Sequence, residues 1–176
     1  MVKANMGLIP EANAIIQEAM TQAATRGIPP LQELDLLLNK GEVCIFSNDV
    51  DNCQRHMKFG LSLCEDREYF NDLRQQGEYK AKFLTLMGIS YVGESTGKDT
   101  FIVQQTGIVD NRLKHLNKAE SFLLSALEIS ELSPTKNIEM ATIVYYLGLI
   151  HQLRGDFYQA KKSFVRALEF RVSYKE

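Results

Sequence analysis

The stretch that decides the fold is Ala141–Leu168, which reads ATIVYYLGLIHQLRGDFYQAKKSFVRAL. Apolar residues recur at helical spacing on both sides of Gly155-Asp156, and this pattern predicts two helices, at 137–153 and 157–173. Gly155 can adopt the positive φ that ends the first helix, and Asp156 can cap the second. We therefore expect a helical hairpin in this part of the chain.

Small residues in this stretch have the spacing of a close helix crossing. Gly148, Ala160 and Ala167 stand at positions i, i+12 and i+19. Two antiparallel helices approach closely only where no bulky side chain stands between them, and Phe164 can fill the space between the close points. The two helices are therefore expected to pack tightly against each other.

This hairpin resembles the tetratricopeptide repeat, a helix-turn-helix unit of about 34 residues. The Leu-Gly pair of the family falls on Leu147-Gly148, its small positions on the second helix fall on Ala160 and Ala167, and its large position falls on Phe164. The resemblance implies an all-α fold, a right-handed α-solenoid in which successive hairpins stack. It also implies a protein-interaction function without enzymatic activity.

The same spacing occurs upstream. Gly41, Cys53 and Gly60 again stand at i, i+12 and i+19, and Asn48-Asp49 takes the place of Gly155-Asp156. This copy predicts helices at 31–47 and 49–64.

The middle of the chain allows two alignments. Gly88 matches the glycine of a first helix, and Ala119 matches a small residue of a second helix. They are 31 residues apart, whereas the other two hairpins have a spacing of 12, so the chain between them carries an insertion. We favour a long helix at 68–93, an inserted segment at 94–112 and a second helix at 113–131. The alternative uses Gly107, which has the i, i+12 spacing to Ala119, and places the first helix at 100–113. The insertion is expected to pack on the stack as a short helix or to fold into the groove described below.

The N-terminal region predicts one more helix, at 10–26. Pro10 suits a first helical turn, and Gly27 with Pro29-Pro30 forces the helix to stop. Such a helix can cover the apolar end of a stack. We expect a single domain over residues 1–176, with repeat-like units at 34–67, 78–131 and 141–174.

The resemblance also indicates a binding surface. In tetratricopeptide arrays the concave wall comes from the first helix of each hairpin, and it binds a peptide or a helix of a partner protein. A further feature of some members, a Lys/Asn/Arg clamp for a C-terminal carboxylate, is not matched here, since those positions hold Leu38, Glu42, Leu86, Thr142 and Tyr146. The wall residues that the resemblance implies are Leu38, Glu42, Ile45, Phe46, Lys82, Thr85, Ile89, Val92, Tyr145, Leu149 and Gln152.

Composition argues against several other functions. The 176 residues carry a net charge of −2, which does not favour nucleic-acid binding. Cys44, Cys53 and Cys64 form no C-x-x-C pair, the histidines are far apart in the sequence, and Gly93–Asp99 lacks the spacing of a phosphate-binding loop. No apolar run is long enough for a membrane helix. We expect a cytoplasmic protein with buried free thiols, no catalytic site, no metal and no cofactor.

Two alternatives to a binding scaffold stay open at this point. One is a regulatory sensor domain that binds a small peptide signal and changes the curvature of the stack. The other is a structural stack that associates with itself through its terminal helices, because no polar capping helix is evident after 157–173. Its end face would then include Val165, Leu168 and Val172.

Overall fold

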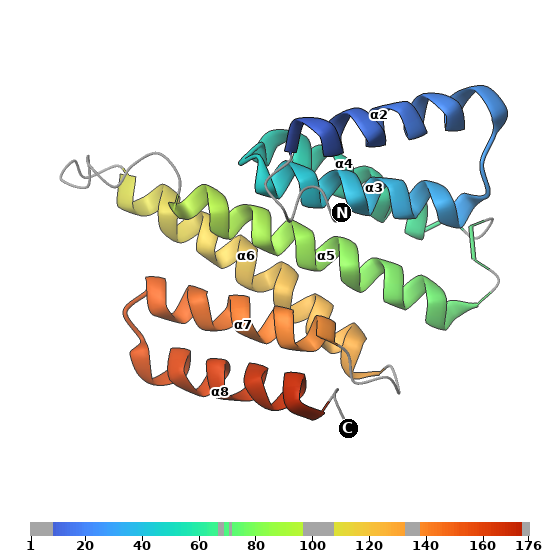
Figure 1. Cartoon of the computed structure of the whole chain (residues 1–176). Coiled ribbons are helices and arrows are strands. Elements are labelled where there is room, and N and C mark those ends of the chain that lie inside the picture. The colour runs from blue at the N-terminus through green and yellow to red at the C-terminus, as the bar shows by residue number, and fades with distance from the viewer. Residues whose placement is uncertain (1–8, 67–68, 71, 97–107, 133–137, 174–176) are drawn as a thin grey trace.

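The computed structural model describes residues 9–66, 69–70, 72–96, 108–132 and 138–173. These residues form seven helices and no strand, which confirms the expected all-α class. The helices follow one another along the chain with short connections between α2, α3 and α4 and between α7 and α8 (Figure 1). Their bounds are α2 Ile9–Arg26, α3 Pro30–Phe46, α4 Val50–Cys64, α5 Leu73–Thr96, α6 Ile108–Glu131, α7 Ile138–Leu153 and α8 Phe157–Ser173.

Five of these helices agree closely with the sequence-based bounds, but α5 and α6 do not. Helix α5 begins at Leu73 instead of 68 and continues to Thr96, and α6 begins at Ile108 instead of 113. The predicted insertion at 94–112 is therefore helical at both ends, and its middle, 97–107, lies outside the described residues. The alternative first helix at 100–113 is wrong, because 108–113 form the first turns of α6.

The turns between paired helices have the chemistry that the sequence predicts. Gly155 has a φ of +84°, and the backbone N–H of Gln159 donates to Asp156 Oδ1 at 3.1 Å. Asn48 likewise has a positive φ of 55°, and Asp49 caps α4 by accepting from the backbone N–H of Asn52. Both hairpins thus use a left-handed residue followed by an aspartate cap.

Glycines mark the closest approach within each hairpin. A Cβ built at Gly148 would lie 2.7 Å from Cε1 of Phe164, and one built at Gly88 would lie 2.6 Å from Cγ of Leu123. A Cβ at Gly41 would overlap the end of the Met57 side chain. The glycine of each first helix therefore leaves room for a large side chain of the second, and Gly88 is the crossing glycine of the middle pair.

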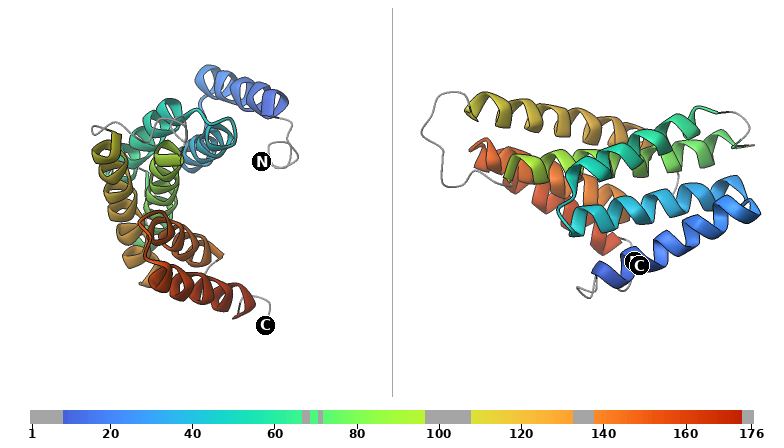
Figure 2. Two further views of the ribbon diagram at one scale, coloured as in Figure 1. Left: turned by 90° about the vertical axis from the view of Figure 1, so that its left-hand side faces the viewer. Right: turned by 90° about the horizontal axis from the view of Figure 1, so that it is seen from above.

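The helices pair as three hairpins, α3 with α4, α5 with α6, and α7 with α8. The pairs also contact one another in order, α4 with α5, α6 with α7, and the first helices α3, α5 and α7 in succession. Seen from the side, the helices follow an arc from α2 to α8 (Figure 2, left). One buried cluster runs through the three hairpins, and it includes Leu34, Met57, Phe83, Leu123 and Ile143.

The N-terminal helix is attached more lightly. Helix α2 packs on α3 through a separate small cluster of Ala12, Ile16 and Val43. Lys40 of α3 also donates a hydrogen bond to Asn13 Oδ1 at 3.2 Å.

The three cysteines are free and buried, as the sequence predicts. Burial raises the pKa of the Cys53 thiol to about 12 and that of Cys64 to about 11. None of the helices in the described ranges combines the length and the apolar character that crossing a membrane requires.

Candidate functional site: a groove on the first helices

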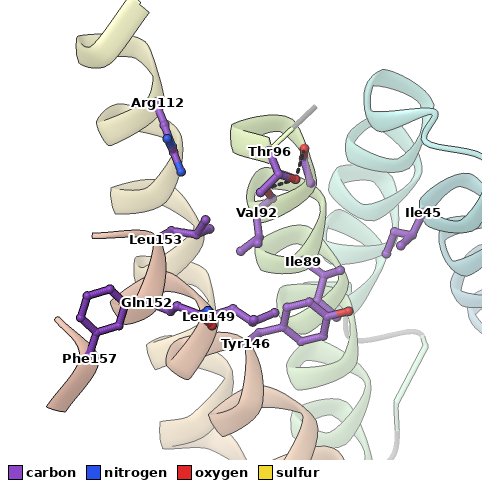
Figure 3. A pocket seen from close by; sticks show the side chains of 11 residues that line it. Ile45, Ile89, Val92, Thr96, Arg112, Tyr146, Leu149, Gln152, Leu153 and Phe157 are labelled. Atoms are coloured by element: carbon purple, nitrogen blue, oxygen red, sulfur yellow. Dashed lines mark hydrogen bonds between the residues drawn. The ribbon is translucent and has the colours of Figure 1, made fainter. Parts of the chain in front are cut away.

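An open cavity lies on the first helices of the three hairpins. Its volume is about 570 Å³, which is within the range of small-ligand and peptide side-chain pockets. Figure 3 shows its side chains, which come from α3, α5 and α7, with one residue each from α6 and α8. The lining residues are Ile45, Ile89, Val92, Gly93, Thr96, Arg112, Tyr146, Leu149, Gln152, Leu153 and Phe157.

Helical periodicity brings these residues to one face. On α5, Ile89, Val92 and Thr96 are spaced i, i+3 and i+7. On α7, Tyr146, Leu149 and Leu153 have the same spacing, and Gln152 precedes Leu153. The contact between α5 and α7 places the two rows side by side. The wall is mostly apolar as a result.

Several residues of the predicted wall lie in this groove and others do not. Ile45, Ile89, Val92, Leu149 and Gln152 line it together. They come from all three first helices.

Leu38 and Thr85 lie elsewhere because both are buried inside the helix stack. Leu38 belongs to the main core cluster, and the Thr85 hydroxyl donates to the Ala81 carbonyl at 2.8 Å. Helix α5 contacts α3, α4, α6 and α7, so side chains on most of its surface are covered. Neither residue lines the cavity. Ile89 and Val92 are also largely buried, at 8% and 5% exposed, but part of each reaches the cavity wall.

The other predicted wall residues do not line the cavity. Phe46 is exposed at the end of α3, and Tyr145 is exposed and packs its ring against Tyr146 and Phe164, with centroids at 5.4 and 5.5 Å. Lys82 is exposed, with its ammonium 5.1 Å from the centre of the Tyr79 ring. Glu42 is half-buried on α3, and burial raises the pKa of its carboxyl.

Sequence reasoning missed Thr96, Arg112, Tyr146 and Phe157 as wall residues. Arg112 lies within the expected insertion at 94–112, so the favoured alignment includes it in neither helix of the middle pair. The spacing of Val109, Leu113 and Leu116 at i, i+4 and i+7 is the signal that could have extended α6 backwards to include it.

Arg112 is the only charged residue among those that line the groove. Its Nε atom is inaccessible to solvent and has no hydrogen-bond partner among the described residues. The neighbouring Arg154 differs, since its guanidinium donates to Glu120 at 2.7 Å and to Asn117 at 2.8 Å. The groove therefore combines apolar walls with an unsatisfied cationic donor.

A smaller cavity of about 270 Å³ lies between α5, the end of α6 and the start of α7. Glu139 lines it, and burial raises the pKa of this carboxyl to about 7, with Lys82 opposing and Glu78 reinforcing the shift. Its lining combines the buried Ala81 and Ser130 with the exposed Leu73 and Leu132.

The groove has few polar groups. Its polar groups besides Arg112 are the Thr96 hydroxyl, which donates to the Val92 and Gly93 carbonyls, the Tyr146 hydroxyl and the Gln152 amide. Burial raises the pKa of the Tyr146 hydroxyl above its ordinary value. Within the described ranges, no three His, Cys, Asp or Glu side chains are grouped so that they could hold a metal ion.

Comparison with known proteins gives no relative from which a function could be transferred. No family model, no curated protein and no solved structure matches this sequence.

Proposed function

We propose that this chain is a non-enzymatic interaction module that binds a peptide or a helix of a partner protein in the groove formed by α3, α5 and α7. The observation that carries the proposal is the open cavity of about 570 Å³ with a mostly apolar wall supplied by three successive first helices. Exposed apolar surface of this kind is removed from water when a partner covers it, and that transfer favours binding.

The proposal includes the fold family. Three hairpins with matched glycine crossings, and contacts from α3 to α5 to α7, support a solenoid similar to tetratricopeptide repeats. In such an arrangement the first helices form a continuous inner wall, which suits an amphipathic helix or an extended peptide. A cytoplasmic location is part of the same proposal, and the buried free thiols support it.

The test begins with peptides, because no partner has been identified. Random linear peptides displayed on phage are selected on the intact chain, and the selected sequences are synthesised with a fluorescent label and with amidated C-termini. Their affinities are measured by fluorescence polarisation for the wild type, for Leu149→Glu in the groove and for Leu124→Glu on α6. Leu124 is about half exposed and lies outside the groove, so its variant controls for the added charge.

We expect Leu149→Glu to weaken binding at least about tenfold, because it places a carboxylate in an apolar wall, and Leu124→Glu to leave it unchanged. Circular dichroism verifies that both variants remain helical. Peptides that bind all three proteins equally, or the absence of any selected peptide, would contradict the proposal.

Self-association is a second candidate function, and the exposed side of α8 favours it. Val165, Leu168 and Val172 are spaced i, i+3 and i+7 and are 48%, 63% and 58% exposed. Among the described helices, α8 packs closely only on α7, so this apolar stripe is uncovered there. Light scattering after size-exclusion chromatography tests it: a dimer that Leu168→Glu dissociates supports self-association, and a monomer at all concentrations excludes it.

A further inference from the structure

Arg112 has an unusual position for an arginine. Its side chain leaves the second turn of α6 and extends toward the groove beside Val92 and Leu153 (Figure 3). The Nε–H is buried without a hydrogen-bond partner among the described residues. A buried donor on a charged group loses its water without compensation, and this costs more free energy than a satisfied pair does.

No acidic side chain among the residues lining the groove can satisfy Arg112, since none of them is Asp or Glu. Glu94, near the end of α5, is already engaged: its carboxylate lies 3.7 Å from His115 Nε2 and accepts from Gln54 Nε2 at 3.2 Å. Arg154, in contrast, has its own carboxylate in Glu120. Among the described residues, therefore, no acidic side chain pairs with the Arg112 guanidinium.

The surroundings of Arg112 select the chemistry of that group. An arginine guanidinium presents several N–H donors in a planar fork that matches a carboxylate, and such a pair is stronger in an apolar, water-poor site than at an open surface. The Gln152 amide lines the same groove and adds donors that a carboxylate can use. Ile45 lies on the other side of α5 from Arg112, so an apolar wall extends away from the cation (Figure 3).

We propose that Arg112 sets the specificity of the groove by pairing with an Asp or Glu side chain of the bound segment, whose apolar side chains pack along Val92, Ile89 and Ile45. This inference rests on the proposed function, because it names the chemical class of the segment that the groove takes. Charge complementarity selects this occupant: the only charged lining residue is a cation, and the part of the chain that the structure describes gives its Nε–H no acceptor.

A double-mutant cycle tests the pairing. The peptides selected above are compared with copies in which each Asp becomes Asn and each Glu becomes Gln, on the wild type and on Arg112→Gln. Arg55→Gln is the matched control, because Arg55 is exposed on α4 and does not line the groove. Thermal unfolding of each variant shows that the fold is retained.

We expect the selected peptides to share an acidic residue whose replacement by the amide weakens binding to the wild type and to Arg55→Gln about tenfold or more. The same replacement should change binding to Arg112→Gln by less than about twofold, since the cation is already removed. Amidated peptide C-termini ensure that the effect comes from a side chain.

Three results would overturn the inference. They are selected peptides without a common acidic residue, an acid-to-amide effect that is equal on the wild type and on Arg112→Gln, and groove binding that requires a free C-terminal carboxylate. In each case, if Leu149→Glu still lowers the affinity for the selected peptides, the proposed function stands. If Leu149→Glu leaves that affinity unchanged, the proposed function is wrong as well.

Discussion

Replacing Gly60 by alanine places a methyl group where the ring of Phe83 lies. Gly60 is buried on α4, and Phe83 is a fully buried residue of α5, so the contact joins the first hairpin to the second. A Cβ at Gly60 would lie 2.7 Å from Cδ1 of this ring and closer still to two other ring atoms. Because the ring belongs to the main core cluster, it can move only if its neighbours move with it.

The magnitude follows from two opposing terms. Alanine stabilises a helix interior by about 1 kcal/mol relative to glycine, and overpacking a core costs about 1–3 kcal/mol. Gly93→Ala isolates the first term, since Gly93 also lies within a helix and a Cβ there would meet nothing within 4 Å. We therefore expect Gly93→Ala to raise the free energy of unfolding. The free energy of unfolding of Gly60→Ala should be about 1–3 kcal/mol lower than that of Gly93→Ala.

Urea unfolding followed by circular dichroism measures both variants beside the wild type, with the slope of the transition compared as a test of two-state behaviour. If Gly60→Ala and Gly93→Ala stabilise the protein equally, α4 and α5 do not approach at Gly60 and the packing between the hairpins is wrong.

Three further predictions concern single side chains. Burial raises the pKa of the Cys53 thiol to about 12. A disulfide reagent at pH 8 should therefore label Cys53 slowly in the folded protein and at once in the urea-unfolded protein. Rapid labelling of the folded protein would contradict the packing of α4. Burial raises the pKa of the Glu139 carboxyl to about 7 in the folded state from an ordinary value of 4.5. The charged carboxylate therefore destabilises the folded state, and this destabilisation is absent below about pH 4.5 and complete above about pH 7. Glu139→Gln should therefore raise the free energy of unfolding by about 1–3 kcal/mol at pH 8 and leave it unchanged at pH 4, and equal effects at the two pH values would show that Glu139 is not desolvated. Asp156→Ala removes the cap that accepts from the Gln159 N–H and should lower the free energy of unfolding by about 1 kcal/mol in urea titrations; an unchanged midpoint would mean that water replaces the cap.

The sequence predicted the hairpins well because close helix packing constrains residue size. Gly148 must be small where Phe164 crosses it, and Gly41 must be small where Met57 crosses it, so the spacing of small residues records which helices touch. The turns were equally readable, since a positive φ and an N-terminal cap each demand particular residue types, as at Gly155-Asp156.

The bounds of α5 and α6 were harder to predict. Helix α5 is surrounded by four other helices, so apolar residues occur on most of its sides and their pattern does not single out one face. The resemblance placed Thr85 in the wall, but the helices packed around α5 bury it. Gly93 also looked like a helix end, although the helix continues through it to Thr96.

The cation of the groove could not be predicted from the repeat pattern. Arg112 lies in the turns by which α6 extends beyond the usual length of a second helix, and the repeat pattern has no corresponding position. Tyr146 was missed because it stands next to Tyr145, the position that the resemblance supplies. Phe157 was missed because it begins α8, whereas the resemblance takes the wall from first helices.

The central claim is that the wall formed by α3, α5 and α7 receives the partner, and methyl NMR tests it most directly. The chain is labelled at isoleucine, leucine and valine methyl groups and titrated with a selected peptide. We predict that the resonances of Ile45, Ile89, Val92 and Leu149 shift, while those of Leu124 and Leu168 stay in place. Shifts confined to Leu168 and its neighbours on α8, with the four groove residues unchanged, would contradict the account.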